Sequence, residues 1–123
     1  MPNHFRILIV EDEMMTARFL GMLLEGEGHE VLPAVATGEA AIISAEQNQP
    51  TLILMDIRLA GSMDGIQAAE KILAKRTAHI IFMTGYREDA VSQSVQKFRP
   101  LGCLEKPLTI ADIKTLLDEK VPK

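Results

Sequence analysis

Three acidic side chains, Glu11, Asp12 and Glu13, directly follow a run of β-prone apolar residues in the sequence ILIVEDE. Like charges at the end of a buried strand repel one another, and burial raises that cost. The cluster therefore predicts either carboxylates that point into water or a positive charge among them. Glu13 fits the first choice, because an acidic residue in the first turn of a helix stabilises the helix dipole.

The elements that would position these groups alternate between apolar runs and helical patterns. Strands are expected over 5–10, 30–35, 51–55, 79–83 and 101–104. Helices are expected to end near Gly26, to span about 37–47, 64–75 and 88–98, and to follow Thr109. This alternation predicts right-handed crossovers and a parallel sheet with helices on both faces.

Local signals support this assignment. Residues at three- and four-residue spacing predict the apolar face of the first helix, namely Met15, Phe19, Leu20, Leu23 and Leu24. Pro33 cannot donate to a neighbouring strand, so the second strand belongs at a sheet edge. The sequences beginning at Asp64 and Thr109 are typical of helix caps.

The carboxyl ends of several strands carry groups that could do chemistry. The first strand delivers the acidic cluster, and later strands deliver Asp56, Thr84 and Lys106 to the same edge, where such sheets bind ligands. Clustered carboxylates predict a hard divalent cation, most plausibly Mg²⁺. Asp56 could then act as a nucleophile that forms an aspartyl phosphate, while the cation and the lysine neutralise the transferred group. The hydroxyl of Thr84 suits another phosphoryl oxygen.

Five motifs occur in order at these positions: LIVEDE, LILMDIRL, MDG, FMTG and EKP. Together they resemble the receiver domain of two-component response regulators, and the resemblance covers the whole chain. It implies one receiver domain over 1–123, with a flavodoxin-like, doubly wound, five-stranded parallel sheet in the order 2-1-3-4-5 and five helices.

The resemblance also implies a metal site. Asp12 and Asp56 would ligate Mg²⁺ directly, Glu11 would help through water, and the backbone carbonyl of Arg58 would complete the protein ligands. No other cofactor is implied.

The remaining implied roles concern phosphate. Asp56 would accept it from a histidine kinase or phosphotransfer protein, Lys106 would contact the phosphoryl group, and Thr84 would close onto it. The bond from Lys106 to Pro107 would be cis, as it usually is in the family.

The sequence departs from the family pattern in the region that switches. Most receivers carry Tyr or Phe three residues before the lysine, and this chain has Cys103. Tyr86, two residues after Thr84, is a candidate substitute. The sequence FMTGY and the longer DIRLAGSMDG loop resemble an atypical receiver subgroup described in alphaproteobacteria.

Composition excludes other classes. The net charge of −4 and the absence of Trp argue against a nucleic-acid binder. No apolar run is long enough to cross a membrane. The single cysteine, Cys103, cannot form an internal disulfide, which favours a reducing cytoplasm.

The leading hypothesis is a stand-alone signalling module, not an enzyme apart from self-catalysed phosphoryl transfer and slow autodephosphorylation. It would contact a downstream protein through the surface formed by 88–98, 101–104 and the last helix. A haloacid-dehalogenase-type phosphatase would need a second aspartate two residues after Asp56, where this chain has Arg58. A flavodoxin-like nucleotide binder would need a Gly- or Ser/Thr-rich loop after the first strand, where this chain is acidic. The alternative left open is a receiver-fold docking module that phosphate does not switch.

Overall fold

Five parallel strands form one sheet in the computed structural model, which describes residues 4–90 and 92–121. The strands are β1 (Arg6–Val10), β2 (Glu30–Val31), β3 (Leu52–Asp56), β4 (His79–Thr84) and β5 (Gly102–Glu105). Their order is β2-β1-β3-β4-β5. The predicted fold class and strand order are therefore confirmed.

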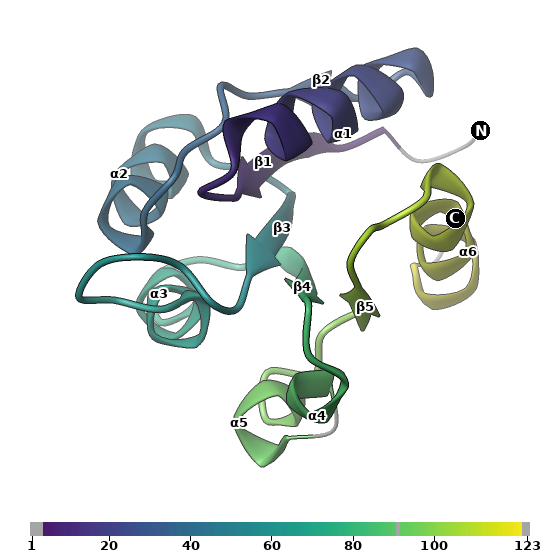
Figure 1. Ribbon diagram of the computed structural model, residues 1–123. Helices are drawn as coiled ribbons and strands as arrows, with labels where there is room; N and C mark the ends of the chain where they lie inside the picture. Colours follow the sequence, from purple (N-terminus) through teal and green to yellow (C-terminus); the bar gives the residue numbers. More distant parts are fainter. Residues whose placement is uncertain (1–3, 91, 122–123) are drawn as a thin grey trace.

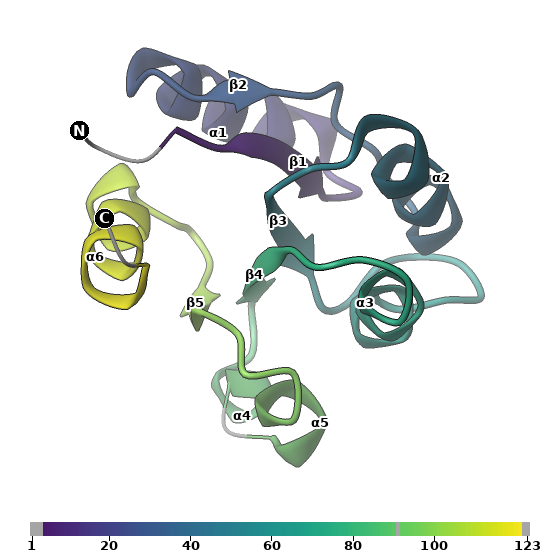
Figure 2. The ribbon, with the colours of Figure 1, turned by 180° about the vertical axis from the view of Figure 1, so that it is seen from behind.

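Helices cover both faces of this sheet. Within the described residues they are α1 (Met14–Gly26), α2 (Gly38–Asn48), α3 (Gly65–Leu73), α4 (Arg87–Ala90), α5 (Gln93–Gln96) and α6 (Ile110–Lys120). Helices α1 and α6 pack on one face, and α2, α3 and α5 on the other (Figures 1 and 2). None of the described helices is both long and apolar enough to span a membrane.

Two apolar clusters fill the space between the sheet and its helices. Along β1, Leu8 and Val10 face the cluster under α2 and α3, whereas Ile7 and Ile9 face the cluster under α1 and α6. Because both faces of β1, β3 and β4 are covered, these three strands are almost continuous apolar runs.

The predicted apolar face of α1 is partly wrong. Its buried residues are Ala17, Leu20, Gly21 and Leu24, which follow a helical repeat. Met15 and Phe19 are instead 80% and 59% exposed. The small residues Ala17 and Gly21 lie on the contact line, and a Cβ on Gly21 would make ordinary van der Waals contact with Cγ1 of Val31 at 3.5 Å.

The helix predicted over 88–98 is two short helices, so the described residues hold six helices rather than five. Ser92 caps α5, because its hydroxyl accepts a hydrogen bond from the Val95 N–H at 3.3 Å. A serine side chain that bonds the backbone in this way starts a new helix instead of continuing the old one. Residue 91, in the middle of the predicted helix, lies outside the described residues.

The edge position of the second strand and two helix caps are confirmed, but that strand is shorter than the predicted range 30–35. Strand β2 has only two residues and lies at the sheet edge, before Pro33. Asp64 forms a full capping box at α3, and Thr109 caps α6 through the Asp112 N–H.

Candidate functional site

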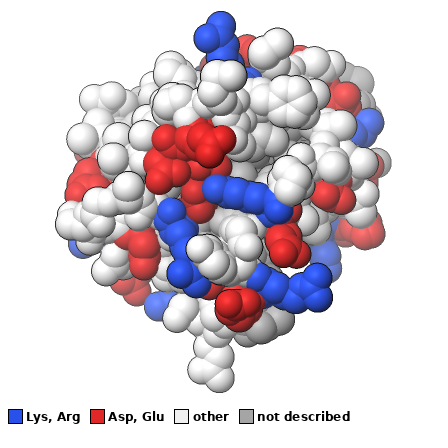
Figure 3. Space-filling view, viewed as in Figure 1, with Lys and Arg blue, Asp and Glu red and all other residues white. Residues whose placement is uncertain are grey.

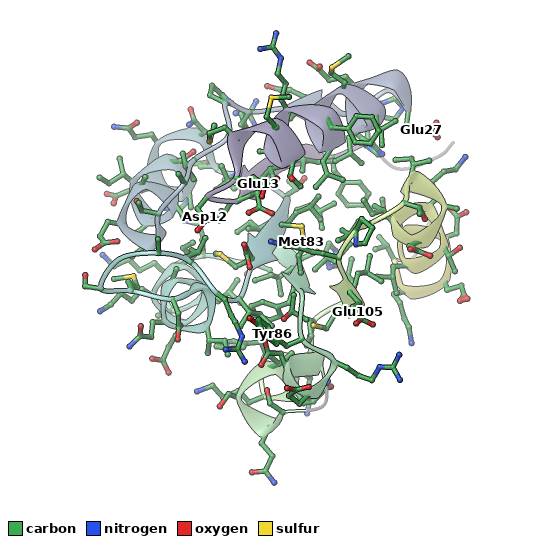
Figure 4. All side chains as sticks on the ribbon, in the orientation of Figure 1. Asp12, Glu13, Glu27, Met83, Tyr86 and Glu105 are labelled. Atoms are coloured by element: carbon green, nitrogen blue, oxygen red, sulfur yellow. The ribbon has the colours of Figure 1, made fainter. Side chains whose placement is uncertain are left out.

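Three carboxylates meet at the carboxyl edge of the sheet. Glu11 and Asp12 follow β1, and Asp56 ends the neighbouring strand β3. One oxygen from each lies within 4.8 Å of the other two. Glu11 and Asp56 are only 1% and 3% exposed, whereas Asp12 is open to solvent. Figure 4 shows Asp12 and Glu13 in the loop that enters α1. The sequence therefore correctly predicts that these acidic groups come together.

Lys106 supplies the positive charge among them. Its Nζ lies 2.7 Å from Oε1 of Glu11 and 2.7 Å from Oδ2 of Asp56. Burial lowers the pKa of Lys106, but the two carboxylates together outweigh that effect, so its pKa lies above its usual value. The lysine therefore stays charged and bridges two buried acids.

One ammonium does not balance three carboxylates. Burial raises the pKa of Glu11, which shows that its charged form is short of compensation. Its Oε1 is buried and accepts no well-directed hydrogen bond, although the Lys106 Nζ lies 2.7 Å away. A cluster of carboxylate oxygens with one open member, Asp12, suits a hard cation such as Mg²⁺ that keeps part of its water. The residues present therefore fit the predicted metal.

The segment after β3 holds the Asp56 carboxylate in place. The Arg58 N–H donates to its Oδ1 at 3.0 Å, which fixes the orientation of the carboxylate. Further along, the Gly65 N–H donates to the Ile57 carbonyl at 2.8 Å, so the start of α3 lies against the end of β3. A Cβ on Gly65 would overlap the carbonyl oxygen of Asp56, which explains the glycine of the MDG motif.

Thr84 ends β4 next to Asp56, but its hydroxyl is bonded elsewhere. It donates to Oδ2 of Asp89 at 2.6 Å and accepts from the Tyr86 N–H at 3.0 Å. The Arg58 guanidinium donates to both Asp89 oxygens, at 2.9 and 3.0 Å, and this pairing lowers the pKa of Asp89. The same guanidinium lies 4.0 Å from the centroid of the half-exposed Tyr86 ring.

Asp89 and the side chain of Arg58 are missing from the sequence-based site. Arg58 is named there only for its backbone carbonyl, whose role stays a prediction. A five-residue spacing between Thr84 and Asp89 across a loop matches no known motif, so the sequence held no signal for this contact.

Pro107 and the exposure of Glu13 are as expected, although Glu13 is the N-cap residue of α1 and not part of its first turn. Glu13 is exposed and its carboxylate accepts a hydrogen bond from the Thr16 hydroxyl at 2.8 Å, outside the acidic cluster. The peptide bond from Lys106 to Pro107 is cis.

Cys103 occupies the position where most receivers carry Tyr or Phe. It lies opposite Phe82 in the pairing of β4 with β5 and is partly buried. Phe98, whose ring centroid is 5.8 Å from that of Phe82, packs against the same cluster. This part of the core thus keeps aromatic packing from Phe98, although β5 carries a thiol.

Burial also lowers the expected reactivity of this thiol. It raises the pKa of Cys103 from 9.0 to about 11. Because the thiolate is the nucleophile, we expect alkylation by iodoacetamide at pH 7.5 to be about 100-fold slower than in the urea-unfolded chain. The native rate should rise about tenfold per pH unit up to pH ~11. Mass spectrometry of the time course measures this, and a native rate within threefold of the unfolded rate would contradict it.

An apolar groove borders the site between α1 and the segment after β5. It is lined by Met15 and Phe19 on one side and by Lys106, Pro107 and Leu108 on the other. On the same face of the molecule, acidic and basic side chains lie next to one another (Figure 3). An apolar surface thus adjoins the charged centre.

Comparisons with known proteins agree with this geometry. Residues 7–118 match the family model described as response regulator receiver domain. Transcriptional regulatory protein PdtaR of Mycobacterium tuberculosis is 32% identical over 108 residues, 88% of this chain and 52% of that protein. Sporulation initiation phosphotransferase F of Bacillus subtilis is 28% identical over 95% of this chain and 94% of its own length.

A solved structure shows the same fold. The N-terminal domain of a response regulator/sensory box/GGDEF 3-domain protein from Carboxydothermus hydrogenoformans superposes with a TM-score of 0.81 at 33% identity. The match covers 92% of this chain and 90% of that one. The chain spans about half the length of the curated relative PdtaR.

Proposed function

Because this chain belongs to the response regulator receiver domain family of two-component signalling, we propose that it is a phosphorylation-controlled module whose phosphoacceptor is Asp56. One observation carries the proposal: the buried Asp56 carboxylate is held by Lys106 beside two other acids that fit a cation. Receiver domains of this family typically bind Mg²⁺ at such a cluster. The relative named as a phosphotransferase, which this chain matches over 94% of its length, supports phosphoryl chemistry.

In the proposed reaction, a carboxylate oxygen of Asp56 attacks the phosphorus of a phosphohistidine. A new P–O bond forms, the P–N bond breaks, and its electron pair returns to the donor imidazole. Lys106 neutralises charge on the transferred group, and the Arg58 N–H keeps the carboxylate oriented. Mg²⁺, when bound by Asp12, Asp56 and Glu11, would add charge neutralisation at the phosphoryl oxygens.

The proposal includes no enzymatic activity on other substrates. The chain catalyses its own phosphorylation by positioning Asp56, and the aspartyl phosphate is lost slowly to water. A cytoplasmic location is also proposed, supported by the single cysteine.

Exposed apolar side chains on α1 support a protein as the phosphoryl donor. Met14, Met15, Phe19 and Met22 are each at least half exposed, and two of them line the groove beside Lys106. Contiguous exposed apolar surface next to a reactive group is typical of a protein interface. We therefore place the histidine-bearing donor on α1 and the groove.

Replacing Phe19 by Ser should slow phosphoryl transfer from a histidine kinase about tenfold, because an exposed aromatic anchor is lost. Labelling by acetyl phosphate, which needs no docking, should change less than about twofold. Ile43→Ser is the matched control, since Ile43 is similarly exposed but lies on α2. Equal slowing with both donors would place Phe19 in folding or chemistry instead of docking.

The downstream partner is proposed to bind the surface formed by α4, α5, β5 and α6. This surface is connected to the site, because Thr84 contacts Asp89 of α4 and Lys106 directly follows β5. A structural change at the phosphoacceptor can therefore alter this surface through these two connections.

The test is incubation of the chain with acetyl phosphate and Mg²⁺, followed by intact-mass measurement. We expect a gain of one phosphoryl group that disappears when EDTA replaces Mg²⁺. No mass gain, with partner binding unchanged by the treatment, would overturn the proposal in favour of the docking module that phosphate does not switch.

A further inference from the structure

The Thr84 hydroxyl is hydrogen-bonded to Asp89, which is paired with Arg58, and none of the roles proposed above uses these contacts. We propose that Asp89, anchored by Arg58, is a latch that holds Thr84 away from the phosphoacceptor until Asp56 is phosphorylated. The latch consists of these three side chains: Thr84, Asp89 and Arg58. The inference rests on the proposed function of Asp56 and adds a positioning residue, Asp89, that sets how readily the phosphorylated form is reached.

The proton count of the hydroxyl carries the argument. A threonine hydroxyl has one proton to donate, and Thr84 gives it to an Asp89 oxygen at 2.6 Å. A phosphoryl group on Asp56 offers only acceptor oxygens, so Thr84 must break this bond before it can donate there. The bond to be broken is strong, because its acceptor is a carboxylate.

Other hydrogen bonds hold Asp89 in place, so it would not follow the Thr84 hydroxyl if that hydroxyl turned toward Asp56. Both of its oxygens accept from the Arg58 guanidinium, at 2.9 and 3.0 Å, and its N–H donates to the Tyr86 carbonyl at 3.1 Å. Arg58 in turn belongs to the loop whose N–H holds Asp56. The latch therefore joins the segment after β3 to α4 while Thr84 is turned toward α4.

Release of Thr84 would also change the surroundings of Tyr86. This residue donates its N–H to the Thr84 hydroxyl at 3.0 Å, and its ring lies 4.0 Å under the Arg58 guanidinium. Figure 4 shows Tyr86 near α4, close to the proposed downstream surface. Tyr86 is the single tyrosine in a chain without tryptophan, so tyrosine fluorescence reports on this position alone.

The experiment measures the affinity of the full chain for beryllofluoride, a phosphoryl mimic, in the presence of Mg²⁺. Tyr86 fluorescence is the signal, with NMR shifts as a second readout. Asp89→Asn should bind the mimic about tenfold more tightly than the wild type, because a neutral amide holds the hydroxyl less strongly. The same variant should melt at a lower temperature without the mimic. A merely structural role for Asp89 would lower both stability and affinity.

Two controls separate the latch from simple charge removal. Glu88→Gln makes the same charge change at an exposed position one residue away on α4, and should change affinity less than about twofold. In a Thr84→Val background, Asp89→Asn should lose its effect, since there is no hydroxyl to release.

The outcomes distinguish the latch from the function on which it rests. If the wild type binds beryllofluoride but Asp89→Asn binds no more tightly, the latch is wrong and the proposed function stands. An equal gain in the Thr84→Val background also overturns the latch. If neither chain binds the mimic or accepts phosphate, the proposed function and the latch are both overturned.

Discussion

Replacing Asp56 by Asn is expected to abolish phosphorylation, with labelling by acetyl phosphate reduced at least about 100-fold. An amide has no anionic oxygen to attack phosphorus, although it has nearly the same shape as the carboxylate. The fold should survive, because Lys106 keeps its ion pair with Glu11 and the repulsion among the three acids falls. Intact-mass spectrometry measures the labelling, and circular dichroism checks the fold.

A matched variant makes this prediction specific to the acceptor. Asp64→Asn makes the same chemical change eight positions along the chain, at the N-cap of α3. Asparagine is about as good an N-cap as aspartate, so stability and labelling should both stay close to wild type. Full labelling of Asp56→Asn, or a label mapped to Asp12, would show that the acceptor is misassigned.

The sequence predicted well which residues come together at this edge, because topology determines their proximity. Once the strands are parallel, their carboxyl ends share one edge, and the residues after them must meet there. Glu11, Asp56 and Lys106 lie within ion-pair distance for this reason, although they are far apart in the sequence. The fold itself follows from continuous apolar strands that alternate with capped helices.

The buried face of α1 could not be predicted because the helix is apolar nearly all round. Its sequence, MMTARFLGMLLEG, offers several apolar stripes of similar quality. The choice among them depends on tertiary packing against the sheet, and the stripe that is buried contains the small residues Ala17 and Gly21. Hydrophobic spacing alone favoured the larger Met15 and Phe19, which the structure leaves exposed beside the site.

The latch was missed for a different reason. The contact of Thr84 with Asp89 is made across the turn after β4, and Ser92 starts a separate helix after α4. Neither is encoded in a periodic pattern. An aspartate beside two charged residues is typical of solvated surface, whereas in the structure the Asp89 side chain is mostly buried against Arg58.

Replacing Lys106 by Met should destabilise the metal-free chain by about 3 kcal/mol. The variant keeps an apolar stem but removes the ammonium, which leaves Glu11 and Asp56 as buried carboxylates without their cation. Such uncompensated buried charges are among the most costly single changes in a protein. Urea unfolding in EDTA measures the loss, and acetyl phosphate labelling should also slow because charge on the transferred group is less neutralised.

Millimolar Mg²⁺ should restore part of this stability, since a cation among the same carboxylates replaces the missing charge. The matched control is Lys97→Met, which removes an exposed ion pair with Glu70 at 3.3 Å and should cost less than about 0.5 kcal/mol with no Mg²⁺ effect. Equal losses in the two variants would mean that Lys106 does not compensate buried charge. A loss confined to Lys106→Met that Mg²⁺ leaves unchanged would mean that the cation does not enter this cluster. If Mg²⁺ restores stability only to Lys106→Met, the cation and the lysine compensate the same carboxylates around Asp56. Phosphoacceptor chemistry at Asp56 requires this compensation.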